Sequence, residues 1–194
     1  IHWGNDRLTI QFDPYLNYFP NYIYMNPTPN YYEGLQWYYY TQSRVIRCGF
    51  ELQADWKILP SLSAEFKGEY LYAEQLSGEK KGYTLPFSTP WSADATLRYA
   101  FCRKNVGNEG FVAMNMHVTG RQNNIVPPEK PTPGYYTLNL TAGKDFAFGE
   151  RTLRLSLNAE NLLNRKYYDH TSFYRLIDVP EPGRNVALMA TFEF

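Results

Sequence analysis

The sequence contains no run of about 18 consecutive apolar residues, and this excludes a transmembrane helix. It has only two cysteines, Cys48 and Cys102, which are too few and too far apart for a disulfide framework or a zinc site. Its 19 basic and 19 acidic residues leave a net charge of zero and form no basic stripe. We therefore expect no nucleic-acid partner.

Patterns of catalytic and metal-binding residues are also missing. The three histidines, His2, His117 and His170, are widely spaced and belong to no metal-ligand motif. There is no serine elbow and no glycine-rich phosphate loop. We expect that the protein is not an enzyme and that it has no catalytic residue, no metal site and no cofactor.

What the sequence does contain is strict alternation, which is clearest in residues 152–194. Apolar residues occupy every second position of 153–159, and again of 186–194 after a polar, aromatic loop. Period two predicts strands with one apolar and one polar face. The last residue, Phe194, is an outward-facing aromatic, as is common in outer-membrane barrels. We predict that Phe194 is a membrane-insertion signal.

The same alternation extends over the whole chain and predicts an all-β protein. Aromatic residues make up 18% of the sequence, with 18 tyrosines, while the mean hydropathy is −0.50. Both values suit a membrane barrel, whose strands are half polar and whose interfaces are rich in tyrosine. Eight strands are expected, near 7–25, 35–58, 61–72, 91–101, 111–120, 135–146, 152–160 and 185–194.

Two features of the first strand guide its expected course. Pro14 is a candidate bulge, and the segment Asn26-Pro27-Thr28-Pro29-Asn30 is expected to end the strand.

The expected connections alternate in length, as they do in outer-membrane barrels with long extracellular loops and short periplasmic turns. The long connections are 26–34, 73–90, 121–134 and 162–183, and the short ones are 59–60, 102–110 and 147–151. By this count the last strand runs inward, and Phe194 lies at the periplasmic rim.

The apolar face is expected to meet lipid. On strands three to eight this face is read as free of charge, whereas the other face carries residues such as Arg47, Glu51 and Asp55. A Lys or Arg facing lipid at mid-bilayer costs about 2–4 kcal/mol, which explains the segregation. A soluble lipocalin-like barrel would reverse the two faces, but the aromatic strand ends, loop lengths and final Phe favour lipid outside. Cys48 is then a small lipid-facing residue, and no disulfide is expected.

Several short motifs occur in the order found in TonB-dependent outer-membrane receptors, and the chain resembles the C-terminal barrel portion of that family. The motifs are Gly49-Phe50-Glu51, Leu85-Pro86-Phe87-Ser88-Thr89-Pro90, Thr132-Pro133-Gly134-Tyr135, Asn161-Leu162-Leu163-Asn164, Tyr167-Tyr168-Asp169-His170, Pro182-Gly183-Arg184-Asn185 and the final Phe.

The resemblance implies an antiparallel transmembrane β-barrel of roughly 22 strands, plugged by an N-terminal domain. Residues 1–194 would be the C-terminal part of that barrel, with the plug and the N-terminal strands absent. The implied location is the outer membrane of a Gram-negative bacterium. The implied partners are outer-membrane lipid, the protein's own plug, the TonB complex through the missing N-terminal part, and a small nutrient ligand.

The implied function is active import of a scarce nutrient, of the siderophore, metal-chelate (iron uptake) or cobalamin type, energised through TonB. The candidate ligand-binding residues lie in the outer loops and the upper wall: Tyr31, Tyr32, Tyr38, Tyr40, Tyr168, His170 and Arg175. The alternative for Tyr167, Tyr168 and His170 is that they stabilise the loop and the interface belt. Glu51 is a candidate for a contact with the plug or a neighbouring strand.

A second hypothesis is a complete eight-stranded outer-membrane barrel with a structural or adhesive role in its loops. Eight strands enclose an interior just wide enough to be filled by side chains. The length of the strands and the many inward charges favour a broad lumen instead.

Overall fold

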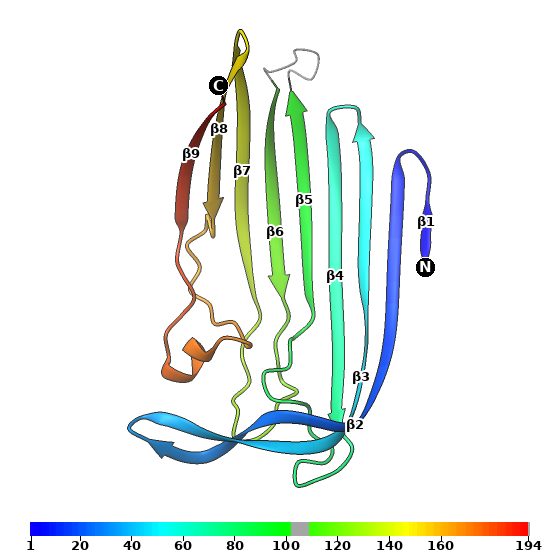
Figure 1. Ribbon diagram of the computed structural model, residues 1–194, viewed down its shortest axis with the longest axis vertical. Helices are drawn as coiled ribbons and strands as arrows, with labels where there is room; N and C mark the ends of the chain where they lie inside the picture. The colour runs from blue at the N-terminus through cyan, green and yellow to red at the C-terminus, as the bar shows by residue number, and fades with distance from the viewer. Residues whose placement is uncertain (102–108, 194) are drawn as a thin grey trace.

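The computed structural model describes residues 1–101 and 109–193, which form one antiparallel sheet of nine strands (Figure 1). Each strand pairs with the next along the chain, in the order β1 to β9. The strands are β1 (His2–Gly4), β2 (Leu8–Tyr32), β3 (Leu35–Leu59), β4 (Leu62–Gln75), β5 (Ser92–Phe101), β6 (Gly110–Thr119), β7 (Tyr135–Phe148), β8 (Arg151–Glu160) and β9 (Asn185–Glu193). The all-β, antiparallel fold class predicted from the alternation is confirmed.

The pairing register brings the predicted apolar positions onto one face. A continuous row of directly paired residues crosses five strands of the sheet: Ala54, Phe66, Ala95, Met116 and Leu138. The row beside it is polar and lies on the opposite face: Gln53, Lys67, Asp94, His117 and Thr137. Directly paired residues of an antiparallel sheet point to the same side, so each strand separates the two kinds of side chain. We call these the apolar face and the polar face.

Charged residues do occupy apolar-face positions, where none was expected on strands three to eight. Glu74 and Arg151 lie at strand ends, paired with Ile46 and Phe148, and a third lies further into its strand. Lys144 of β7 is directly paired with Leu155 of β8. Its ammonium group lies 5.6 Å from the ring centroid of Phe101 and 5.3 Å from that of Phe146. The position is near the β7–β8 turn, where a long lysine can reach the membrane interface while its stem packs on rings.

The first strand differs most from the sequence-based expectation. The predicted break at 26–30 is wrong, because β2 continues to Tyr32 and pairs Asn26 with Tyr39 and Pro27 with Tyr38. In this part of β2 the only neighbouring strand is β3. A proline, which lacks an amide hydrogen, therefore leaves no hydrogen bond to a second neighbouring strand unmade. The predicted loop 26–34 is accordingly a tight turn at Glu33 and Gly34, both with positive φ.

The bulge and the strand count also needed correction. Pairing is continuous across Pro14, and the register shifts instead at two other places, between Phe19 and Tyr22 and between Pro27 and Tyr31. The sheet has nine strands and not eight, because β1 adds a three-residue strand beside β2. Three residues are too short to display a period-two alternation, so this strand could not be predicted from the pattern.

The two ends of the sheet differ as predicted. Short turns join β3 to β4 and β7 to β8, whereas long connections span 76–91, 120–134 and 161–184. The expected 102–110 turn lies largely outside the described residues, as does Phe194. The 161–184 connection contains a 3-10 helix, η1 (Phe173–Ile177). No helix in residues 1–101 and 109–193 is long and apolar enough to cross a membrane.

At the long-loop end, β2 and β3 extend past the rest of the sheet. The ladder between β3 and β4 ends at the pair Val45–Gln75, so residues 20–44 form a two-stranded ribbon that we call the strap. Figure 1 shows that the strap turns sharply and runs across the lower ends of the neighbouring strands. Buried Val45, Ala73 and Leu85 form a small core at this bend.

Candidate functional site

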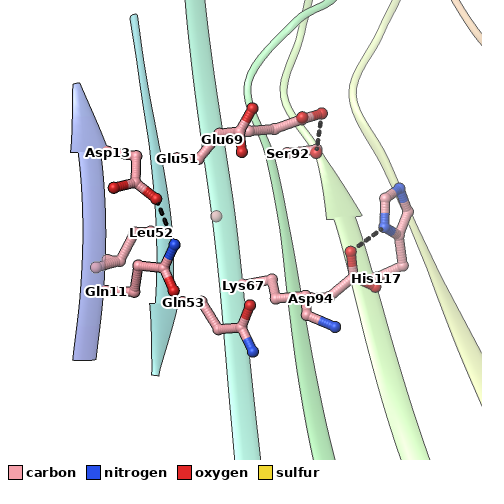
Figure 2. Close-up of a pocket in the computed structure, with 11 residues that line it drawn as sticks. Gln11, Asp13, Glu51, Leu52, Gln53, Lys67, Glu69, Ser92, Asp94 and His117 are labelled. Carbon is pink, nitrogen blue, oxygen red and sulfur yellow. Dashed lines mark hydrogen bonds and ion pairs between the residues drawn. The ribbon is translucent and has the colours of Figure 1, made fainter. Parts of the chain in front are cut away.

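The polar face carries a hollow of about 360 Å³ beside the middle strands (Figure 2). Period-two alternation on five neighbouring strands points the lining side chains into it: Gln11, Asp13, Glu51, Gln53, Lys67, Glu69, Ser92, Asp94 and His117. Neighbours within the hollow are paired by hydrogen bonds. The Gln11 amide donates to Asp13 at 2.6 Å, and the Ser92 hydroxyl donates to Glu69 at 2.8 Å.

A hydrogen-bonded chain closes one side of the hollow. His117 lies with Nδ1 3.1 Å from Asp94 Oδ2 and Nε2 2.9 Å from the Thr119 hydroxyl. The second Asp94 oxygen accepts a hydrogen bond from the Asn115 amide at 3.2 Å. The arrangement holds the His117 ring against the wall, between two strands.

The hollow is acidic overall. Four carboxylates line it, from Asp13, Glu51, Glu69 and Asp94, against one lysine and one histidine. The Lys67 ammonium is already in contact with Glu65, so it neutralises little of that charge. A partner that fills this hollow is therefore favoured if it brings basic groups. Within the described residues, no three His, Cys, Asp or Glu side chains could hold a metal ion together.

The surroundings of Gly49 explain why the motif Gly49-Phe50-Glu51 begins with glycine. A Cβ atom at this position would lie 2.0 Å from the Tyr70 carbonyl oxygen and 2.7 Å from the Tyr15 hydroxyl. Only glycine leaves room for the Tyr15 ring, which lies over the strand on the polar face. Glu51, two positions further on, points into the hollow.

A second group of polar side chains is buried among the long loops. Arg175 Nη2 donates to Glu129 Oε1 at 2.7 Å, and the two side chains are 5% and 1% exposed. Arg175 Nε also donates to the His170 carbonyl at 2.6 Å, while the Thr132 hydroxyl lies 3.0 Å from His170 Nδ1. The Phe87 amide donates to the same Glu129 oxygen at 3.1 Å. We call Phe87, Glu129, Thr132, His170 and Arg175 the loop cluster.

Aromatic contacts join the strap to this cluster. Phe87 and Phe173 have ring centroids 4.6 Å apart, and Tyr38 of the strap lies 6.1 Å from Phe87 and 6.4 Å from Phe173. The Arg175 guanidinium lies 5.1 Å from the Phe87 ring centroid, a cation–π distance. Three loops and the strap therefore meet at one place.

Burial shifts the pKa values of two loop-cluster residues, His170 and Glu129, and acts on the pKa of the adjacent Asp169. It lowers the pKa of His170 to about 4, and the adjacent Arg175 charge acts in the same direction. Burial raises the pKa of the Glu129 carboxyl, although the Phe87 amide and Arg175 oppose it. Burial would also raise the pKa of Asp169, but hydrogen bonds from Thr171 and Tyr135 outweigh it and leave that pKa lowered.

The structure places the seven predicted ligand-binding residues in three separate surroundings. Tyr31, Tyr32 and Tyr40 lie on the strap and are 65%, 61% and 78% exposed. Tyr168 is half-buried, with the Lys166 ammonium 5.6 Å from its ring centroid. Tyr38, His170 and Arg175 come together in or beside the loop cluster, and His170 is only 1% exposed.

The residues that sequence reasoning missed are those whose partners are distant in the chain. Glu129 lies between prolines and carried no periodic signal, yet it is the buried partner of Arg175. Phe87 belongs to the motif Leu85-Pro86-Phe87-Ser88-Thr89-Pro90, whose sequence does not indicate its contact with Glu129. The Asp94–His117 pair was visible as two inward positions, but its contact depends on the register of β5 and β6.

The fold and the two faces define a class of protein: a wall segment of a membrane β-barrel, with lipid on one side and a polar lumen on the other. The family model described as TonB dependent receptor-like, beta-barrel, matches residues 1–162, and the chain belongs to this family. It is an outer-membrane barrel family of Gram-negative bacteria. The predicted family resemblance is therefore confirmed.

Solved structures with the same fold are receptors of this kind. The copper transporter OprC superimposes with a TM-score of 0.77 at 17% identity, over 95% of this chain and 28% of that one. BauA, the ferric preacinetobactin receptor from Acinetobacter baumannii, gives 0.70 at 13% identity, over 98% and 28%. The FrpB iron transporter from Neisseria meningitidis gives 0.69 at 15% identity, over 96% and 29%. No curated protein matches the sequence.

The chain thus spans less than a third of the length of each of these three solved receptors. At these identities the likeness concerns the fold alone.

Proposed function

We propose that residues 1–194 are the C-terminal wall of an outer-membrane importer for a scarce nutrient, energised through the TonB complex. The observation that carries the proposal is an open sheet with an apolar outer face and a charged inner face, in a chain covering about 28% of each of two similar receptors. In the whole protein the plug and the preceding strands complete the barrel. TonB acts on the N-terminal part.

The proposed cargo is a siderophore, another metal chelate or cobalamin. Receptors of similar fold include a copper transporter and a ferric preacinetobactin receptor, which supports a metal-containing cargo. Direct contact with the cargo falls to the exposed tyrosines of the strap, Tyr31, Tyr32 and Tyr40, and to Tyr168. Tyrosine offers a ring for stacking and a hydroxyl for hydrogen bonds. His170 and Arg175 would act indirectly, by shaping the loops.

The acidic hollow of the polar face is the proposed contact site for the plug domain. Four carboxylates in one hollow leave an excess of negative charge that a basic partner surface neutralises. Glu51 has no ion pair within the described residues, which leaves it available for such a contact.

The rival hypothesis is a complete eight-stranded barrel that acts through its loops. Such a barrel requires its first and last strands to pair with each other. Among the described residues β1 pairs only with β2 and β9 only with β8, which argues against it.

Uptake by cells that carry the complete receptor tests the proposal. Cells of a receptor-deletion strain, with and without the receptor gene, are offered iron-loaded siderophores, a copper salt and cobalamin at nanomolar concentration. We expect receptor-dependent uptake of one cargo that stops when TonB is deleted.

The intact mass of the receptor from outer membranes is the matched measurement. We expect a mass several times 22.7 kDa. A mass near that value, together with no TonB-dependent uptake, would favour the eight-stranded barrel.

A further inference from the structure

All the connections at the long-loop end meet at the loop cluster. Phe87 comes from 76–91, Glu129 and Thr132 from 120–134, and His170 and Arg175 from 161–184. The strap adds Tyr38, whose ring lies against Phe87 and Phe173. Segments more than a hundred residues apart in the chain are thus joined by a few side chains.

Arg175 is the centre of this arrangement. Its guanidinium contacts the Glu129 carboxylate, the His170 carbonyl and the Phe87 ring, and each belongs to a different part of the cluster. The Glu129–Arg175 pair is almost wholly buried, so its loss would leave an uncompensated charge in the loop interior. Breaking the Glu129–Arg175 contact is therefore costly.

His170 places a titratable group inside the same cluster. The side chain is 1% exposed, and its Nε2 atom is buried with no hydrogen-bond partner, as is Glu129 Oε2. The other ring nitrogen faces the Thr132 hydroxyl. A proton added to this ring would therefore create a second buried cation close to Arg175, with no carboxylate in hydrogen-bond contact.

We propose that the loop cluster is an acid-sensitive latch: with His170 neutral it holds the strap across the end of the wall, and proton uptake by His170 opens it. This inference rests on the barrel wall with its long loops outside, and does not depend on the nutrient carried.

The charged groups around His170 set the direction of the effect. Arg175 and Asp169 act on His170 directly, Glu129 reaches it through Arg175, and Tyr38 faces the pair from the strap. From β7, Tyr135 donates a hydrogen bond to Asp169 at 2.9 Å.

The sign of the pH dependence follows from the pKa values. The pKa of His170 is about 4 in the closed latch and about 6.5 when the ring is free, so the open state takes up the proton first and is favoured as pH falls. By its titration alone, His170 should make the opening constant about 30-fold higher at pH 5 than at pH 7.5.

The two carboxyl groups act differently. The pKa of Glu129 is raised in the closed state, so the closed state binds this proton first. Protonation of Glu129 therefore favours the closed state as pH falls. Asp169, with its lowered pKa, disfavours the closed state only at lower pH. Glu129 therefore opposes His170 on acidification, and comparison with a variant that lacks the histidine isolates the His170 contribution.

Hydrogen exchange of the complete receptor in lipid nanodiscs, read by mass spectrometry at pH 7.5 and 5.0, tests the latch. Rates are corrected for the intrinsic exchange at each pH, and no nutrient or TonB is present. We expect peptides from the strap and from the three loops to open together by the same factor on acidification. In the His170→Asn variant, which cannot titrate, that pH step should fall to less than threefold.

A pair of arginine variants provides the matched control. Arg175→Met should raise exchange of the strap and all three loops at least tenfold already at pH 7.5. Arg165→Met removes an exposed arginine of the same loop, whose guanidinium lies 4.4 Å from the Tyr136 ring centroid, and should change only its own segment.

Protection of the β7 and β8 amides confirms that each variant is folded. Independent opening of the loops, an unchanged pH step in His170→Asn, or equal effects of the two arginine variants would each overturn the latch. None of these results bears on whether the receptor imports a nutrient.

Discussion

At the scale of single residues, the shape of the polar face depends on a glycine that leaves space for a neighbouring ring and on the alternation that points side chains inward. Gly49 gives Tyr15 a place to lie on the wall, and the side chain of Glu51 then enters the hollow. A larger residue in its place would meet the Tyr70 backbone, which cannot move without breaking the β3–β4 ladder.

We therefore expect Gly49→Ala to destabilise the barrel. The added methyl group overlaps both the Tyr70 carbonyl oxygen and the Tyr15 ring, and overpacking of this kind costs about 1–3 kcal/mol. Gly68→Ala is the matched control, because its Cβ would make only ordinary van der Waals contacts, with the Phe66 ring at 3.4 Å and the Ser92 carbonyl oxygen at 3.8 Å. Urea unfolding of the complete receptor should place Gly49→Ala well below both the wild type and Gly68→Ala. Equal midpoints for the two variants would contradict the contact.

At the scale of elements, the strap is the part of β2 and β3 that extends beyond the neighbouring strands of the sheet. Beyond Val45 it has only its own two-stranded ladder, and an isolated hairpin is marginally stable in water. Its position must then come from contacts with the loops. Tyr38 supplies the aromatic ones, and the Tyr39 hydroxyl adds a hydrogen bond to Glu79 at 3.3 Å.

Tyr38→Ala should consequently release the strap, while Tyr40→Ala should leave it in place. Tyr38 packs against two rings, whereas Tyr40 is 78% exposed. Limited proteolysis of the receptor in outer-membrane vesicles checks this, with a non-specific protease added from outside. We expect cleavage within 20–44 to become several-fold faster in Tyr38→Ala only. If both variants were cleaved alike, the strap would not be held by Tyr38.

At the scale of the whole molecule, the sheet has one face suited to lipid and one face suited to water. Its apolar face is exposed in the isolated chain, with Leu97 at 50% and Leu188 at 75% exposure. A soluble protein rarely leaves so continuous an apolar surface uncovered. Membership of an outer-membrane barrel family explains it, because lipid covers this face.

The two faces of β8 should therefore tolerate charge very differently. Leu157 is paired with Ala142 and Leu188 on the apolar face, further from Lys144 than Leu155 is. Leu157→Arg should cost about 2–4 kcal/mol of membrane stability. Ser156→Arg, on the polar face beside it, should cost little. The amount of heat-modifiable, folded receptor in outer membranes measures both, and equal yields would refute the assignment of the lipid side.

The sequence by itself determined every strand except β1, the two faces of the sheet, and three of the four predicted long loops. These are local properties: a residue's side of a strand depends on whether its position is odd or even, and a face in contact with lipid admits few charges. The order of short motifs, from Gly49-Phe50-Glu51 to Pro182-Gly183-Arg184-Asn185, was also sufficient to indicate the family.

Only the tertiary structure decided the course of the strap and the composition of the loop cluster. Pro27 resembles a strand break in sequence, and only its pairing with Tyr38 of β3 shows that β2 continues through it. Glu129, His170 and Arg175 come from two separate loops and share no period, so their contact depends on where the strands place the loop ends. The approach of Lys144 to the Phe101 ring likewise depends on the folded sheet, because β5 and β7 are both neighbours of β6 only there.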